Sequence, residues 1–115
     1  MNFLPEFIVS KDSHGARISI TGRLDAKGTS SLWQGITKKI SNCDLPNLTL
    51  DLEKVNYLDT AGATFIYHIE KLARTRGVKE FFIVNLKPEF SPLIELAKQI
   101  EQKDFSDQTP IEVDV

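Results

Sequence analysis

The sequence predicts an α/β fold, a mixed sheet of four to five strands with three to four helices mainly on one face. Two observations lead to this fold class. Short β-rich runs alternate with longer stretches in which apolar residues recur every three or four positions, in the order ββαβαβα. Some strands alternate polar and apolar residues, which is typical of a sheet with one open face. Because strand–helix–strand units form right-handed parallel crossovers, the sheet should be parallel in its centre, with the first strand as an antiparallel edge.

The length bounds the domain organisation. A chain of 115 residues, 41% of them apolar, fits one globular domain. We expect a single domain over residues 1–115, with its core over about residues 5–100. Residues 101–115 are mostly polar, and only 111–115 alternate, so this part is expected to be a tail, a last edge strand or a linker.

Charge and composition exclude several classes of function. A net charge of −2 gives no basic field, so no nucleic-acid partner is expected. The single cysteine, Cys43, cannot form an internal disulfide, which fits a reducing compartment. No apolar run approaches the roughly 20 residues that span a bilayer, and residues 1–6 do not resemble a signal peptide. We therefore expect a soluble, cytoplasmic protein.

The first half of the chain predicts a hairpin followed by a helix. Residues 7–10 are β-rich, residues 11–15 are typical of a turn, and residues 17–21 alternate polar and apolar side chains. Residues 28–30 supply a joint and candidate N-caps for the helix that follows. The apolar positions of that helix are Leu32, Trp33, Ile36 and Ile40, with Cys43 at its end.

The second half predicts two more strands and two more helices. Residues 48–52 alternate as in a half-buried strand, and residues 53–58 are expected to form a compact loop. A helical stripe then runs from Ala61 to Ala73. Residues 81–84 are continuously apolar, which indicates a central strand covered on both faces.

The sequence allows two starting positions for the last helix. Ser91 and Pro92 fit the N-cap and first helical position, with Leu93, Leu96, Ala97 and Ile100 on the apolar side. A start near Pro88 would place Pro92 where it removes a helical hydrogen bond.

The stretch from Asp51 to Gly62 connects a predicted strand to a predicted helix and lies at the centre of the predicted functional edge. In a parallel sheet the loops after strands two, three and four leave from one edge, where ligands and partners commonly bind. The polar residues in these loops should therefore gather at that edge. They are Asp25, Asp59, Thr60, Asn85 and Lys87.

The start of the helix after residue 59 suits docking or modification. Asp59 and Thr60 can each cap the helix, a contribution of about 1 kcal/mol. Gly62 disfavours a helix by about 1 kcal/mol relative to alanine, which indicates a need for a small residue. Close packing of the helix on the sheet and close approach of a partner would explain the small residue at position 62 equally well. A phosphate on Thr60 would be tolerated at a helix N-terminus but would repel a partner that docks flush against this edge.

An enzyme is not expected. His68 lies about two helical turns after Thr60 and His14 lies in a turn, so neither histidine activates the hydroxyl. Asp25 and Asp59 lack neighbours that would separate their pKa values. No metal-ligand spacing and no glycine-rich phosphate loop is present, so neither a metal nor a cofactor is expected.

Three segments resemble the pattern of STAS domains (sulfate transporter and anti-sigma factor antagonist). They are Gly22-Arg23-Leu24-Asp25, Asp51-Leu52 with Val55, and Leu58-Asp59-Thr60-Ala61-Gly62. The resemblance covers about residues 5–100 and implies a STAS-type fold. Anti-sigma factor antagonists of this family usually carry Asp-Ser-Ser-Gly with a phosphorylated serine. Here Thr60 takes the place of that serine, and Ala61 replaces the next one.

The Asp-Thr-Ala-Gly version, together with Leu32 and Trp33, is more similar to the STAS domains of Mla-type phospholipid ABC transporters. In that group the domain is a separate subunit or is fused before the permease, and it binds the ATPase subunit and supports transporter assembly and activity. The resemblance implies a partner-binding surface at the cytoplasmic face of the inner membrane. The residues assigned to it are Thr60, Asp25, Asp59, Ala61, Gly62 and Lys87.

Two functions from different classes therefore remain. In the first, the chain is a non-catalytic regulatory domain that binds the ATPase subunit and permease of a lipid transporter. In the second, it is an anti-sigma factor antagonist that binds an anti-sigma kinase until Thr60 is phosphorylated. Trp33 and Tyr67 are expected to be partly buried, and exposure of either would make it an interface candidate.

Overall fold

The computed structural model describes residues 4–41 and 46–100. Its elements follow the predicted order ββαβαβα. They are β1 (Glu6–Asp12), β2 (Gly15–Leu24), α1 (Ala26–Ser41), β3 (Asn47–Leu58), α2 (Thr60–Thr75), β4 (Glu80–Val84) and the 3₁₀ turn η1 (Pro88–Phe90), followed by helical residues 91–100. The predictions for Cys43 and for residues 111–115 lie outside the described residues.

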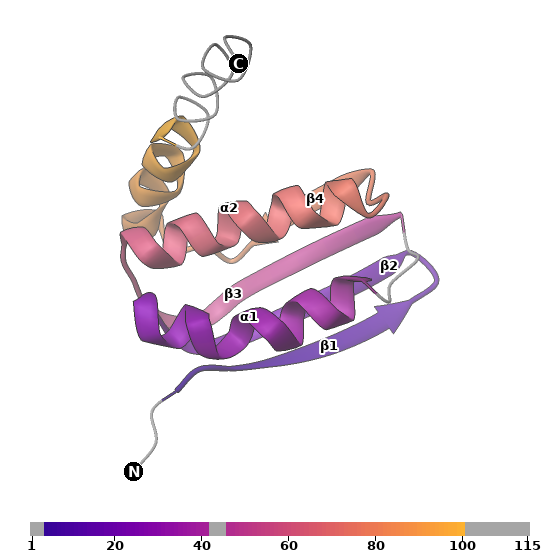
Figure 1. The fold of residues 1–115 in the computed structure, drawn as a ribbon, viewed down its shortest axis with the longest axis horizontal. Coiled ribbons are helices and arrows are strands. Elements are labelled where there is room, and N and C mark those ends of the chain that lie inside the picture. The colour runs from indigo at the N-terminus through magenta and orange to yellow at the C-terminus, as the bar shows by residue number, and fades with distance from the viewer. Residues whose placement is uncertain (1–3, 42–45, 101–115) are drawn as a thin grey trace, which may run out of the picture.

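The four described strands form one mixed sheet in the order β1-β2-β3-β4. β1 pairs antiparallel with β2, whereas β2–β3 and β3–β4 are parallel pairs. This confirms the predicted parallel centre and the antiparallel first edge. Figure 1 shows α1 and α2 side by side over the same face of the sheet, and both begin where β2 and β3 end. The other face carries the polar positions of the alternating strands.

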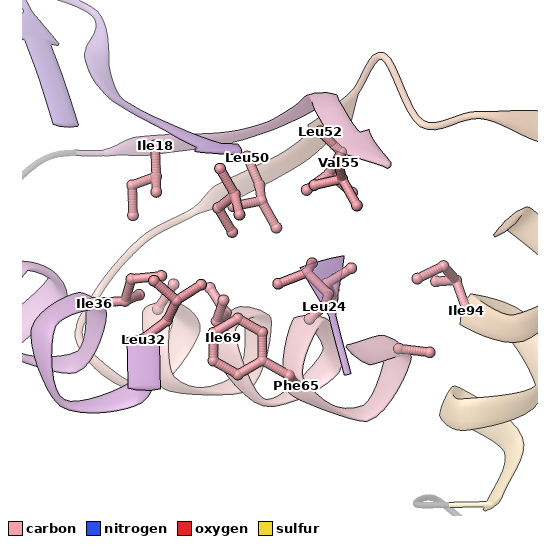
Figure 2. Packing of buried hydrophobic residues seen from close by; sticks show 14 of the residues in the cluster. Ile18, Leu24, Leu32, Ile36, Leu50, Leu52, Val55, Phe65, Ile69 and Ile94 are labelled. Carbon is pink, nitrogen blue, oxygen red and sulfur yellow. The ribbon is translucent and has the colours of Figure 1, made fainter. Parts of the chain in front are cut away.

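The core lies between the sheet and the two helices (Figure 2). Ile18 and Leu50 of the sheet face Ile36 of α1 and Ile69 of α2, and all four side chains are almost fully buried. Ile94, from residues 91–100, closes the core at the end where β2 finishes. The burial of these side chains is the main source of stability, because each contributes roughly 1.5–3 kcal/mol.

The prediction that residues 53–58 form a loop is wrong, because β3 continues to Leu58. Its pairing with β2 shifts register twice, between Ser19 and Thr21 and between Gly22 and Arg23 of β2. Each shift places an extra residue in β3, as in a β-bulge. Buried positions therefore change from every second residue to every third, at Leu52, Val55 and Leu58, and this spacing no longer predicts a strand.

The prediction that residues 81–84 form a central strand is also wrong. Within the described residues β4 is the second edge of the sheet, paired with β3 alone. Phe81 and Ile83 pack against the core, whereas Phe82 is 45% exposed on the open face. A continuous apolar run indicates two covered faces only where helices cover both, and here α1 and α2 lie on one.

The last helical segment begins earlier than its N-cap signal indicates. The 3₁₀ turn Pro88–Phe90 leads directly into helical residues 91–100. Ser91 has helical angles, φ −57° and ψ −43°, so it is not the N-cap. Pro92 is accommodated because the preceding turn is 3₁₀ and the proline lies in the first α-helical turn, where the missing N–H is tolerated.

Candidate functional site

The predicted edge of the sheet is built by two neighbouring strands that end side by side. Leu24 of β2 pairs with Leu58 of β3, and each is followed by an aspartate that starts a helix. The Asp59 N–H group donates to the Leu24 carbonyl over 3.4 Å and so joins the two strand ends. The structure therefore brings Asp25, Asp59 and Thr60 together at one edge.

The two helices begin with the same local structure. Asp25 Oδ1 accepts a hydrogen bond from the Gly28 N–H group at 2.8 Å, and Asp59 Oδ1 accepts one from the Gly62 N–H group at 3.1 Å. Both starts read Leu-Asp-x-x-Gly, at 24–28 and 58–62. This repeated pattern was the signal in the sequence that could have identified both N-caps, and each cap stabilises its helix by about 1 kcal/mol.

Close packing explains both glycines. A Cβ atom on Gly62 would lie 2.1 Å from the Leu24 carbonyl oxygen, and one on Gly28 would lie 2.4 Å from the Arg23 carbonyl oxygen. Gly62 is buried beneath the helix start, so a large side chain at this position would destabilise the fold. Weaker partner binding by such a variant would therefore not identify Gly62 as a contact residue. A contact between Gly62 and a partner stays a prediction.

The carboxylate of Asp25 is held in its charged form. The hydrogen bond from the Gly28 N–H group is the main cause that lowers the pKa of Asp25, and together with the Arg23 side chain it outweighs the opposing effect of desolvation. The guanidinium Nε of Arg23 lies 3.4 Å from Asp25 Oδ2. Asp25 therefore remains a negatively charged cap beside the start of α2.

Thr60 differs from its two neighbours because it is exposed and its hydroxyl has no hydrogen-bond partner among the described residues. Asp59 provides the cap, so the expectation that Thr60 also caps the helix is not met. The hydroxyl is thus available to a partner or to a modifying enzyme.

A shallow groove of about 530 Å³ lies next to Thr60, between the first halves of α1 and α2. Trp33 lies 5.8 Å from Phe65 and 6.4 Å from His68, between ring centroids, and is 36% exposed. This exposure makes Trp33 an interface candidate, whereas Tyr67 is half-buried. The groove is lined by Thr29, Ser30, Trp33, Thr60, Ala61, Thr64, Phe65 and His68.

Asn85 and Lys87 are placed differently from the expectation. β4 ends opposite Asp51, long before β3 ends, so Asn85 does not reach the edge and its amide instead donates to Asp51 at 3.0 Å. Lys87 Nζ donates to the carbonyl oxygens of Val55 at 2.7 Å and Glu53 at 3.4 Å. These carbonyls belong to the part of β3 that has no β4 partner. Lys87 thus donates hydrogen bonds to two β3 carbonyl groups that have no partner in β4. A contact between Lys87 and another protein stays a prediction.

Replacing Lys87 tests this internal role. Lys87→Met keeps the length of the side chain but leaves the Val55 carbonyl without its donor, so we expect unfolding to require about 1 kcal/mol less free energy. Urea unfolding followed by circular dichroism measures the difference. Lys79→Met, which removes an exposed lysine just before β4, is the matched control. Equal stabilities of the two variants would show that the Lys87 ammonium group does not support the edge.

A second polar cluster lies on the open face of the sheet. Asp51 accepts hydrogen bonds from Arg17 at 2.8 Å, from Asn85 at 3.0 Å and from the N–H group of Glu53 at 3.0 Å. Burial raises the pKa of Asp51, but the bonds from Asn85, Glu53 and Arg17 together outweigh this effect and hold the pKa below its ordinary value of 3.8. The Asp51 side chain is 12% exposed.

The lowered pKa of Asp51 predicts a pH dependence of stability. The folded state binds the proton more weakly than the unfolded chain, so the contribution of Asp51 is complete above pH 3.8 and is lost as pH falls through the folded pKa. Asp51→Asn should lower the free energy of unfolding at pH 7 by about 1 kcal/mol, since Arg17 is half exposed, and the difference should shrink near pH 2. Glu53→Gln is the control. A difference that stayed constant down to pH 2 would contradict this assignment.

Two classes of site are absent from the described residues. No group of three or more histidine, cysteine, aspartate or glutamate side chains within 4–41 and 46–100 is arranged to hold a metal ion. In the same ranges no helix has the length and apolar content needed to cross a membrane.

The family of the chain follows from its sequence and agrees with this geometry. The family model described as "Mlab, STAS domain" matches residues 7–99, which include both Leu-Asp-x-x-Gly segments. The chain belongs to the STAS family. Its paired helix starts, with Thr60 exposed at one of them, are thus features of a STAS domain, and the family assignment made from the sequence is confirmed.

Solved structures share this STAS fold at low sequence identity. An anti-sigma factor antagonist from Mycobacterium paratuberculosis has a TM-score of 0.68 and 19% identity, over 85% of this chain and 81% of that chain. The phosphorylated Bacillus cell fate determinant SpoIIAA has a TM-score of 0.62 and 13% identity, over 80% and 83% of the two chains. SLC26A9 matches 76% of this chain with a TM-score of 0.56 and 16% identity, but only 16% of its own length. These likenesses show the fold.

Proposed function

We propose that this STAS domain is a non-catalytic regulatory domain of a Mla-type phospholipid ABC transporter. It binds the ATPase subunit at the cytoplasmic face of the inner membrane and supports assembly and activity of the transporter. The match to the Mlab family model supports this assignment. The observation that carries the proposal is the exposed hydroxyl of Thr60, without a partner among the described residues, at the rim of an open groove.

The geometry suits recognition because the contact residues are held on a rigid base. Asp25 and Asp59 fix the two helix starts through their bonds to backbone N–H groups, and Leu24 ties the helix starts to the sheet. A partner that docks here meets a surface that needs little ordering, so less of the interaction energy is lost on binding. Thr60 and Ala61 are small and leave the backbone of the first turn of α2 accessible.

The groove also argues against a catalytic role for this edge. A hydroxyl nucleophile needs a base within hydrogen-bond reach. His68 lies on the same helix eight residues after Thr60, a separation of about 12 Å along the axis. We therefore assign binding, and no bond-breaking chemistry, to the groove.

A second candidate function has a specific observation in its favour. Two of the similar structures are the unphosphorylated and phosphorylated forms of the anti-sigma factor antagonist SpoIIAA. Thr60 is exposed at the position where the family pattern has its phosphorylated serine, so a kinase could reach it. In this case the partner is an anti-sigma kinase, and phosphorylation of Thr60 releases the STAS domain.

The test is a direct comparison of the two partners. The purified chain is titrated by calorimetry with the ATPase subunit, and separately with an anti-sigma kinase from the same genome. A saturable complex with the ATPase subunit, together with a higher ATPase rate of the assembled transporter, is the expected result. A complex with the kinase alone, followed by incorporation of phosphate at Thr60, would replace the transporter assignment with the second candidate. Absence of any complex with the ATPase subunit would overturn the proposal.

A further inference from the structure

The first strand of the sheet, β1, is an open edge. It pairs with β2 on one side, and Figure 1 shows no described strand or helix beyond its other side. Five of its seven residues are exposed and none is buried, so α1 does not cover this edge. An edge strand turns every second pair of N–H and C=O groups away from its neighbour. β1 therefore offers a row of backbone groups to which another strand can bond.

The side chains of β1 also favour contact with another strand. Ile8 is 68% exposed, more than any other exposed large apolar residue of the described chain. It lies on the open face of the sheet, whereas its neighbours Phe7 and Val9 pack against the core. Native proteins commonly protect an edge strand with a charged residue or a proline in its middle, but residues 7–10 contain neither. The most exposed apolar side chain thus lies on an unprotected edge.

From these observations we propose that the chain forms a homodimer in which β1 pairs antiparallel with β1 of a second copy. The two-fold axis passes through Ile8, and the two four-stranded sheets join into one continuous sheet. Dimers with a two-fold axis are the commonest oligomers, and such an axis brings the same patch of both copies together. Backbone hydrogen bonds hold the two strands, as in other cases of strand addition to the edge of a sheet. This inference goes beyond the proposed function and does not depend on it.

The sequence of β1 selects this axis. When a two-fold axis perpendicular to the sheet passes through Ile8, this residue lies opposite its own copy on the open face. Phe7 then lies opposite Val9 of the second copy on the face that the helices cover, and Glu6 lies opposite Ser10 of the second copy. Each apolar residue of the strand meets an apolar residue, and no like charges face each other. Such cross-strand pairs stabilise a sheet.

The two neighbouring axes fit the strand less well. An axis through Val9 would place Glu6 opposite Asp12 of the second copy, and two carboxylates in this position repel each other. An axis through Phe7 would place Ile8 opposite Glu6 of the second copy, so the exposed apolar side chain would face a charged group. The charges and the apolar residues of β1 therefore favour the same register.

β4 is the other edge of the described sheet and is the comparison for this proposal. It has five residues against seven in β1, so it offers fewer backbone groups to a second strand. Its exposed apolar side chain on the open face, Phe82, is 45% exposed, which is less than the exposure of Ile8. Matched substitutions at these two residues therefore show which edge forms the contact.

Sedimentation equilibrium of the purified chain tests whether the dimer forms. One pair of strands buries a small area, so we expect a weak dimer with a dissociation constant of about 10–100 μM. Ile8→Lys should weaken association by at least about tenfold, because two lysines would face each other across the axis. Phe82→Lys makes the same change on β4 and should leave association unchanged. Urea unfolding confirms that both variants are folded.

A cross-linking experiment tests the register of the two strands. Directly opposite residues of antiparallel strands have Cα atoms about 4.5–5.5 Å apart, which suits a disulfide. In a chain with Cys43→Ser, the Ile8→Cys variant should therefore form a disulfide-linked dimer when oxidised glutathione is added. Ser10→Cys is the control, since two residues at position 10 would be four positions, or about 13 Å, apart along the strands. Electrophoresis without reducing agent measures the linked fraction.

The outcomes separate this inference from the proposed function. A single-chain mass up to about 500 μM, well above the expected dissociation constant, would overturn the dimer and leave the ATPase assignment as it stands. Loss of association in Phe82→Lys but not in Ile8→Lys would move the contact to β4 and also overturn the inference. Equal cross-linking of the two cysteine variants would contradict an axis through Ile8. Thr60→Glu should not change association, because Thr60 follows β3, and β2 lies between β3 and β1.

Discussion

Gly62→Ala is expected to lower the free energy of unfolding by about 3 kcal/mol, the largest effect of any single methyl group added to a described helix. The new Cβ atom would lie 2.1 Å from the Leu24 carbonyl oxygen and 2.9 Å from the Leu24 Cβ atom. Either α2 moves away from the sheet or the end of β2 shifts, and overpacking of this kind costs about 1–3 kcal/mol, occasionally more. Because alanine favours a helix by about 1 kcal/mol over glycine, the steric cost is larger than the expected net loss by about this amount.

Gly35→Ala is the matched control for this substitution. Gly35 also lies within a helix, but its added Cβ atom would meet the end of the Phe7 ring at 2.9 Å, and a side chain at the edge of the sheet can move. Both variants replace a helical glycine by alanine, so their difference compares a contact with the fixed Leu24 backbone with a contact with the movable Phe7 ring. Urea unfolding measures both. A loss for Gly62→Ala no greater than that for Gly35→Ala would show that the helix start is not tightly packed on β2.

Thr60→Glu is expected to weaken binding of the ATPase subunit by about 1–3 kcal/mol, which is roughly tenfold to more than a hundredfold. The new carboxylate would stand beside Asp59 at the rim of the groove, where the two negative charges repel each other and the carboxylate has to be desolvated on docking. It also mimics part of the charge of a phosphate. Calorimetry with the purified ATPase subunit gives the affinity directly.

Two variants accompany this measurement. Thr60→Ala should change the free energy of unfolding by less than about 0.5 kcal/mol, because the hydroxyl makes no hydrogen bond with a described residue and Asp59 keeps the cap. Its affinity then shows whether the hydroxyl itself contributes to the contact. Ser10→Glu introduces the same charge at an exposed site of β1 and should bind like the wild type. Full affinity of the Thr60→Glu variant would remove Thr60 from the interface.

Much of the fold could be predicted because its main patterns are local. The spacing of Leu32, Ile36 and Ile40 depends only on the helix they form, and the parallel crossover fixes how neighbouring strands run. The same rule placed Asp25 and Thr60 at one edge, because both follow parallel strands. These conclusions needed no knowledge of which strand lies in the middle of the sheet.

The remaining features depend on contacts that the sequence does not display. The two bulges in β3 change the spacing of buried residues, so Val55 and Leu58 are not recognisable as strand positions. The apolar run of β4 suggests a covered strand, but the order of the strands decides how much of it is exposed. The sequence predicts Asn85 at the edge because it does not show how far β4 extends along β3, and β4 ends opposite Asp51.

The repeated helix start has a consequence for how the domain can change during evolution. The aspartate and the glycine of each Leu-Asp-x-x-Gly segment are fixed by a cap and by a backbone contact, whereas the residue directly after the aspartate is Ala26 in one copy and Thr60 in the other. Both residues are exposed, so exchanges at this position carry little penalty in stability. A lineage could gain, lose or relocate a modifiable hydroxyl there by single substitutions while the scaffold stays intact.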